Sequence, residues 1–358
     1  MNGRRRYAIL AAGAFADRSA KTAHGVIAYG NDEVVAVIDP AHAGKRVCEV
    51  VPALHSDVPV VADLRAALTF APNALLIGVA PAGGALPPDW RATIVAALDA
   101  GLEVVSGLHQ ILADDLEFAA AAARGGATIW DVRVPPAVPL FSGEAYDVDA
   151  RVVLLVGTDC AVGKMTAALE LTRSALIHGH IARFVATGQT GILIAGGGIA
   201  IDRVIADFAT GAAERLVVEN APGADLLFIE GQGGINNPAY APVTLALLFG
   251  AAPDALILVH RPSRTTIEDF GTPVLSYRTI VRTYEALCAT VKPAKVAGIA
   301  LNTAGLDEAT ARAEIERARA ETGLPADDVV RFGPDDLFAA MEPAFAAKTA
   351  PLGERRHP

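Results

Sequence analysis

The sequence is poor in cysteine and contains no long apolar run. Its 358 residues include only 3 cysteines, and these form no CxxC pair. An odd number of scattered thiols argues against a disulfide framework and a zinc knuckle, and it predicts a reduced, cytoplasmic protein. No stretch of about 18 uncharged apolar residues is present, although a membrane-spanning helix requires one. We therefore expect no membrane partner.

Positive charge is also scarce. The chain carries 30 Lys and Arg against 40 Asp and Glu, a formal net charge of -10. A field of that sign repels phosphate backbones and anionic headgroups, so nucleic acid is not an expected partner. A G-x-G-x-x-G fingerprint is missing as well, because the first apolar run is followed by "AAGAFADRSAKTAHG". Binding of NAD or FAD is therefore disfavoured.

What the sequence does contain is an alternation of strand and helix signals in two blocks. Short apolar runs such as "RYAILA" and "EVVAVID" alternate with helical candidates up to residue 135, and the pattern restarts at "RVVLLVG". Alternation of this kind predicts an α/β fold with parallel sheets. We expect two doubly wound domains: a Rossmann-like domain in 1–135 and a P-loop NTPase-like domain in 151–350. The proline-rich residues 136–150 are the expected linker.

The second block begins with "LLVGTDCAVGKMTAALEL", Leu154 to Leu171. A strand, a glycine-bounded loop and a helix beginning with lysine are typical of a phosphate-binding loop, in which backbone N–H groups surround the anion and the lysine reaches the outer phosphates. The residues assigned to this phosphate or nucleotide site are Gly157, Thr158, Asp159, Cys160, Ala161, Val162, Gly163, Lys164, Met165 and Thr166. Met165 stands where the hydroxyl residue that ligates Mg²⁺ is usual, and Thr166 lies about 100° further round the helix.

The loop "GTDCAVGK" resembles that of dethiobiotin synthetase and related P-loop proteins. That resemblance extends to "LLFIEGQGG" and implies that Glu230 lies beside the phosphates, as a general base or a water-mediated metal ligand. It also implies that Asn302, at the end of "VAGIALN", contacts the nucleotide base. With ATP, Glu230 and Asp202 are the candidate Mg²⁺ ligands, and Lys164 is a candidate catalytic residue.

Polar residues at other predicted strand ends are candidates for the substrate site. Gln189 and Thr190 lie in a glycine-rich segment, and His260 and Arg261 follow an apolar run. The guanidinium of Arg261 suits a carboxylate, and His260 could move a proton near neutral pH. In the first block, Lys21, Thr22 and His24 fall at an expected helix start, a position that favours anions. We expect the substrate to bind between the two domains.

Nearly the whole chain looks like one bacterial family. The segments that carry the resemblance are "AKTAHG", "IGVAPAGG" and "VVSGLH" in the first block, and "GTDCAVGKMTAALEL", "ATGQTGI" and "FIEGQGGINNP" in the second. The family, long labelled as of unknown function, has two domains and includes D-glutamate N-acetyltransferase of the DgcN type. The resemblance implies an N-acyltransferase that acts on a small acidic amino acid.

Three hypotheses remain open from the sequence. In the first, the loop holds the phosphates of acetyl-CoA, and the substrate amine loses a proton to His260 or Glu230 before it attacks the thioester. In the second, an ATP-dependent ligase phosphorylates a carboxylate with the help of Mg²⁺. In the third, the chain is a non-catalytic nucleotide-binding regulator. A homo-oligomer is expected, because the helices are rich in alanine and apolar residues.

Overall fold

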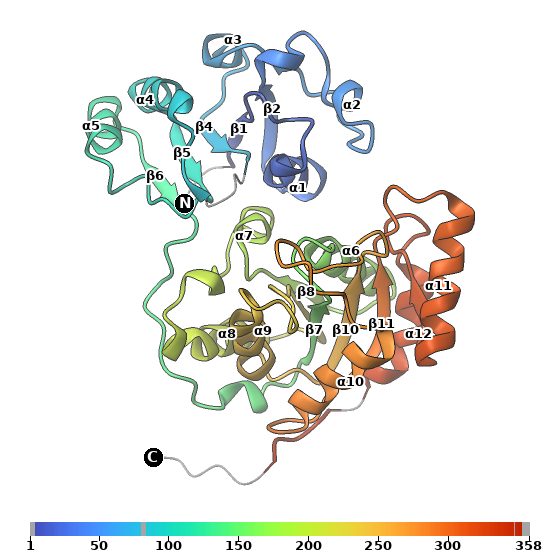
Figure 1. Cartoon of the computed structure of the whole chain (residues 1–358). Helices are drawn as coiled ribbons and strands as arrows, with labels where there is room; N and C mark the ends of the chain where they lie inside the picture. The colour runs from blue at the N-terminus through green and yellow to red at the C-terminus, as the bar shows by residue number, and fades with distance from the viewer. Residues whose placement is uncertain (1–3, 80–83, 347, 353–358) are drawn as a thin grey trace. The chain divides into compact units, whose positions relative to one another are not determined.

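The computed structural model describes residues 4–79, 84–346 and 348–352. Within them the chain forms two six-stranded sheets in which neighbouring strands are parallel, and Figure 1 labels most of their strands. The chain folds as two compact units. The first comprises Met1–Pro135 with Gln189–Ala200, and the second comprises Pro136–Gly188 with Ile201–Pro358. The predicted α/β class is confirmed.

The first unit contains a sheet in the order β3-β2-β1-β4-β5-β6. This is the strand order of the Rossmann fold. The apolar runs recognised in the sequence form its five longer strands, and the two-residue edge strand β3 is too short to leave a periodic signal. The strands are β1 (Arg6–Leu10), β2 (Glu33–Ile38), β3 (Val60–Val61), β4 (Ala74–Ile77), β5 (Glu103–Ser106) and β6 (Ile129–Asp131).

The second unit contains a sheet in the order β12-β11-β10-β7-β9-β8. From β7 the chain first builds toward β8 and β9 and then crosses to β10, so the topological switch point lies between β7 and β10. Open α/β sheets bind ligands at the carboxyl ends of strands at such a point. The strands are β7 (Arg151–Gly157), β8 (Ala182–Val185), β9 (Leu226–Ile229), β10 (Ala255–His260), β11 (Lys295–Leu301) and β12 (Ala326–Asp327).

Helices connect most of the strands and cover the sheets. In the second unit, apolar side chains of α6 and α12, among them Leu171 and Phe338, pack on buried sheet residues such as Leu155. No helix among the described residues has both the length and the apolar character needed to cross a bilayer. The helices are α1 (Lys21–Tyr29), α2 (Val47–Val50), α3 (Leu64–Leu68), α4 (Arg91–Asp99), α5 (Leu116–Gly125), α6 (Lys164–Ile177), α7 (Gln189–Ala195), α8 (Ala206–Asn220), α9 (Ala241–Gly250), α10 (Tyr277–Cys288), α11 (Glu308–Thr322) and α12 (Asp335–Phe345).

Helix α7 departs from the domain division expected from the sequence. All of residues 151–350 were expected in one domain, but Gln189–Ala200 folds with the first unit. Within that unit α7 packs against α1. The reason is apolar burial, because Ile192, Leu193 and Ile194 are all at most 4% exposed. The chain therefore leaves the second unit after Gly188 and returns to it at Ile201.

The proline-rich segment 136–150 is packed and belongs to the second unit, which corrects its assignment as a linker. Ser142 donates hydrogen bonds from its backbone N and its Oγ to Glu214 Oε2, and Ala145 N donates to Glu214 Oε1. Glu214 lies on α8 and is 3% exposed. A buried carboxylate that accepts three hydrogen bonds holds this segment against α8.

Candidate active site

The loop between β7 and α6 has the backbone shape of a phosphate cradle. β7 ends at Gly157 and α6 begins at Lys164. Between them Ala161 and Gly163 have φ angles of 51° and 114°. Such residues turn neighbouring N–H groups toward one side of a loop. At Gly163 the backbone conformation favours a residue without Cβ, which accounts for the second glycine of the motif.

Three consecutive N–H groups of this loop lack an acceptor among the described residues. Those of Ala161, Val162 and Gly163 donate to no group within the described part of the chain. No side chain of the residues that the structure describes caps the start of α6. Unsatisfied N–H groups at a helix N-terminus, together with the helix dipole, stabilise an anion. The loop thus offers what a bound phosphate requires.

The side chain of Asp159 stabilises the loop through hydrogen bonds. Its side chain is fully buried, and its carboxylate accepts hydrogen bonds from Cys160 N, Asn237 Nδ2, Glu268 N and Arg264 Nη1 at 2.7–2.9 Å. Burial by itself would raise the pKa of Asp159, but these donors together outweigh it and hold the pKa below its usual range. A carboxylate repels phosphate, and this one is saturated with donors. The side chain of Asp159 therefore shapes the loop, and the part of Asp159 in phosphate binding stays a prediction.

Lys164 connects the phosphate loop to the turn that follows β9. The residue is 6% exposed, and its Nζ donates to the backbone oxygens of Asp159 and Gly233, both at 2.7 Å. Its ammonium lies against Gly157, where an added Cβ would come within 2.8 Å of Nζ. The sequence predicts that the Lys164 ammonium binds the outer phosphates. In the structure, two backbone carbonyl groups hold this ammonium next to the phosphate loop.

Glu230 directly follows β9 and takes part in several hydrogen bonds. Its Oε2 accepts from Thr187 N and Gly188 N at 3.0 Å, and its backbone oxygen accepts from Thr187 Oγ1 at 2.6 Å. Burial raises the pKa of Glu230 to about 7, and the hydrogen bonds from Thr187 and Gly188 oppose that rise. A carboxyl group with such a pKa exchanges a proton at neutral pH, as a general acid or base must.

His260 lies at the switch point, one residue before Arg261. Its Nδ1 is 2.8 Å from Thr158 Oγ1, and its ring makes an edge contact with Tyr277. Burial lowers the pKa of His260 to about 4, and the charges of Arg317 and Arg264 act in the same direction. A neutral imidazole bonded to Thr158 positions the loop, and its low pKa makes it a weaker base than Glu230.

The side-chain amide of Asn302 is hydrogen-bonded to the protein backbone. Its Nδ2 donates to Val162 O at 3.2 Å, and its Oδ1 accepts from Ala304 N at 3.2 Å. Asn302 also lies against Gly163, where an added Cβ would approach its Nδ2 to 3.3 Å. These contacts explain why an Asn follows β11. They show that it helps to close the phosphate loop. Its expected contact with a nucleotide base stays a prediction.

The remaining candidates of the second unit are more exposed. Arg261 is half-buried, and its Nε donates to Ser263 Oγ at 3.0 Å. Met165 and Thr166 are half-buried in the first turn of α6. Asp202 is exposed in a short 3₁₀ turn. Within the described ranges, no group of three or more His, Cys, Asp or Glu side chains is arranged to hold a metal ion.

The first unit brings together several residues that lie far apart in the sequence. Thr22 Oγ1 and Thr190 Oγ1 are 3.1 Å apart, and both residues are buried. Gln189 packs over Gly107, where an added Cβ would overlap its Oε1. The segments "AKTAHG", "SGLH" and "GQTG" therefore meet in one place. Part of "GVAPAGG", residues 80–83, lies outside the described residues.

Two other predicted substrate residues of the first unit differ in character. Lys21 is exposed at the first position of α1. His24 has a defined structural partner, because its Nε2 is 2.7 Å from Phe15 O and its ring makes an edge contact with Phe15. His24 is thus a fixed part of the fold, whereas Lys21 could reach an anion.

Sequence reasoning missed the residues that hold the phosphate loop in place. Arg264 binds Asp159 and the backbone oxygen of Cys160, and Tyr284 donates to Gly157 O at 2.7 Å. Asn237 supplies the third contact, to Asp159. "INNP" and the second arginine of "RPSR" were visible in the sequence, but their partners lie 78 to 127 residues away. No local pattern identifies such partners.

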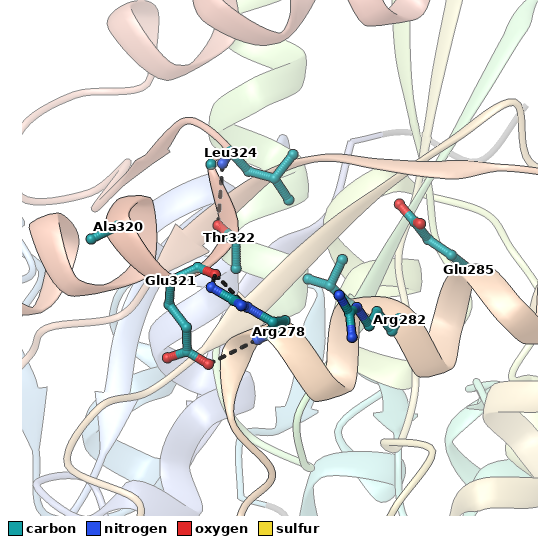
Figure 2. A pocket seen from close by; sticks show the side chains of 9 residues that line it. Arg278, Arg282, Glu285, Ala320, Glu321, Thr322 and Leu324 are labelled. Atoms are coloured by element: carbon teal, nitrogen blue, oxygen red, sulfur yellow. Dashed lines mark hydrogen bonds between the residues drawn. The ribbon is translucent and has the colours of Figure 1, made fainter.

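A separate hollow of about 400 Å³ lies between α10 and α11. Figure 2 shows that Arg278 points to Glu321 across it. Arg278 Nε and Nη2 donate to the backbone oxygen of Glu321, so this arginine caps the carboxyl end of α11. The hollow shares no residue with the phosphate loop, and we assign it a structural origin.

Models of protein families match both halves of the chain. Residues 40–135 match the Rossmann-like domain of DUF1611, and residues 139–338 match its P-loop domain, both described as domains of unknown function. The chain belongs to the DUF1611 family. As a DUF1611 protein it is similar to a solved member from Anabaena variabilis, at 40% identity and a TM-score of 0.91, over 95% of this chain and 100% of that one.

Two curated relatives of this DUF1611 protein carry the name of an enzyme. One is a D-glutamate N-acetyltransferase from Tritonibacter scottomollicae, 42% identical over 75% of this chain and 80% of that protein. The other, from a Pseudoalteromonas species, bears the same name and is 37% identical over 74% of this chain and 80% of that protein. The family predicted from the sequence is confirmed.

Proposed function

We propose that this chain transfers an acetyl group from acetyl-CoA to the amine of D-glutamate or a closely similar acidic amino acid. The observation that carries the proposal is the name D-glutamate N-acetyltransferase shared by two relatives at 42% and 37% identity. Each match covers 80% of the relative and about three quarters of this chain.

The phosphate loop supports acetyl-CoA as the donor. The unsatisfied N–H groups of Ala161, Val162 and Gly163 suit its phosphates, and Lys164 lies beside them. Met165 replaces the hydroxyl that usually ligates Mg²⁺. Acetyl transfer requires anion binding but no phosphoryl activation, so the loss of that hydroxyl carries no penalty for this chemistry.

Glu230 is the base of the proposed reaction. It takes one proton from the substrate ammonium and passes it to solvent, and the neutral amine then attacks the thioester carbonyl. A C–N bond forms, the C–S bond breaks, and the second proton of the nitrogen passes to the sulfur of the departing CoA. Arg261 remains our proposed clamp for a substrate carboxylate, because its guanidinium can bind one in a bidentate manner.

The test is an assay of CoA release with identification of the N-acetyl product by mass. D-glutamate should be acetylated, with L-glutamate and D-aspartate as matched controls for chirality and length. Product formation should persist in excess chelator. Amide formation that requires ATP and Mg²⁺ would instead establish the ligase reaction, and ligand binding without any turnover would favour a regulator. Cytoplasmic location and a homo-oligomer stay predictions.

A further inference from the structure

The turn after Glu230 is fixed by hydrogen bonds at almost every residue. Its sequence is "GQGGINN", residues 231–237. Thr244 Oγ1 donates to Gln232 O, and Lys164 Nζ donates to Gly233 O. Asn237 N donates to Gly234 O. The backbone of this turn is therefore held in one conformation next to the phosphate loop.

Asn236 lies between two residues that are anchored to that loop. On one side, Ile235 N donates to Tyr284 Oη, which in turn donates to Gly157 O at the end of β7. On the other side, Asn237 Nδ2 donates to Asp159 Oδ1. The position of Asn236 is thus set within a few residues of the proposed phosphate site.

The side chain of Asn236 has no partner of its own. Its Oδ1 and Nδ2 are both buried, and neither makes a hydrogen bond within the described ranges. Buried polar atoms are almost always satisfied, and a buried carboxamide with both ends unsatisfied costs stability. The adjacent Asn237 shows the usual state, because both ends of its amide are bonded, to Asp159 and to Ala239 N.

We infer that Asn236 is a substrate-binding residue whose amide engages a group that presents one hydrogen-bond acceptor beside one donor. This inference rests on the proposed acetyl transfer. Two parts of the reactants have that chemistry: the carboxylate and amine of the α-amino acid, and a secondary amide in the pantetheine arm of acetyl-CoA. On binding, the amide would gain hydrogen bonds that it lacks in the ligand-free chain, which favours the bound state.

The test compares Asn236→Leu with Asn237→Leu. Leucine keeps the branched shape of asparagine but carries two methyl groups in place of the amide atoms, so Asn236→Leu removes the two unsatisfied polar atoms. It should keep or raise the Tm of the ligand-free protein while lowering kcat/KM by roughly tenfold to a hundredfold. Asn237→Leu should lower the Tm, because it removes one donor from the buried Asp159 carboxylate and leaves Ala239 N without its acceptor. Asn236→Asp, which loses the donor but keeps the shape, is the second variant.

The kinetic constants distinguish the two sources of the ligand group. A rise in KM confined to D-glutamate identifies the amino acid, and a rise confined to acetyl-CoA identifies the pantetheine arm. Wild-type kcat/KM in Asn236→Leu and Asn236→Asp would overturn the inference and leave acetyl transfer intact. So would losses of activity that follow losses of Tm as in Asn237→Leu.

Absence of acetyl transfer in the wild type would instead overturn the proposed function. Thermal shifts with CoA, D-glutamate and N-acetyl-D-glutamate then decide about Asn236 separately. A ligand-induced shift that is present in the wild type and lost in Asn236→Leu supports the inference. A shift that is unchanged in the variant, or absent from the wild type, overturns it.

Discussion

Glu230 is buried, yet its pKa of about 7 is suited to proton exchange at neutral pH. Since only ionised Glu230 can accept the substrate proton, kcat/KM for acetyl transfer should rise with pH and level off above about pH 7. Glu230→Gln cannot accept a proton and should lose activity by on the order of 10²–10⁴-fold. A pH–rate profile of the wild type and the activity of the variant at its plateau test this. An inflection far from neutrality would assign the base elsewhere.

The raised pKa of Glu230 also makes the stability of the folded chain depend on pH. Between about pH 4.5 and about pH 7 the folded chain binds the Glu230 proton more tightly than the unfolded chain does. The stabilisation from this group is therefore complete below the lower value and lost as pH rises through the upper one. Relative to Glu230→Gln, the wild type should lose Tm across this range. A constant difference in Tm would contradict the shifted pKa.

Lys164 has two separable contributions, one to the loop and one to the ligand. Lys164→Ala leaves two backbone oxygens without their donor, which should cost about 1–3 kcal/mol of stability. It should also remove most of the preference for CoA over phosphate-free pantetheine, because the ammonium faces the phosphate cradle. Thermal shifts with both ligands measure that preference. If it survives in Lys164→Ala, the phosphates bind elsewhere.

At the scale of elements, the sequence predicted those strands and helices whose formation depends on neighbouring residues in the chain. The run before Gly157 and the lysine after Gly163 predicted β7, the loop and α6. Helix α7 was not predicted, because it is short and glycines flank it on both sides, and it is stabilised by packing against α1. The ion pair between Arg264 and Asp159 was missed for a similar reason. These residues are 105 positions apart in the sequence and meet only in the folded chain.

The same distinction holds inside the candidate site. Glu230 was identified because "LLFIEGQGG" resembles a segment of dethiobiotin synthetase-like proteins, whereas its raised pKa follows from burial that only the structure shows. The hydrogen bonds of Asp159 to Arg264 and of Asn302 to Val162 were not predicted. A residue type alone cannot reveal which protein groups its polar atoms contact.

For the whole molecule, the first unit is incomplete without residues 189–200. A fragment of residues 1–135 lacks α7 and leaves the matching side of α1 uncovered. Each fully buried aliphatic side chain contributes about 1.5–3 kcal/mol, and whole domains are stable by only about 5–15 kcal/mol. The fragment should therefore be poorly folded, whereas the same fragment with residues 189–200 fused through a flexible linker should melt cooperatively. Thermal melts monitored by circular dichroism compare them, and equal stability would contradict a structural role for α7.

Because the chain returns to the first unit at residues 189–200, the order of synthesis affects when each unit can complete its folding. Residues 1–135 emerge first, but their unit cannot close until Ala200 has been synthesised. At roughly 5–20 residues per second, the missing stretch takes several seconds to arrive. During that interval the nascent first unit exposes the surface that α7 later covers, and β7 and the phosphate loop are already available to fold. Synthesis of this protein is therefore expected to pass through a stage in which the first unit made is not the first unit finished.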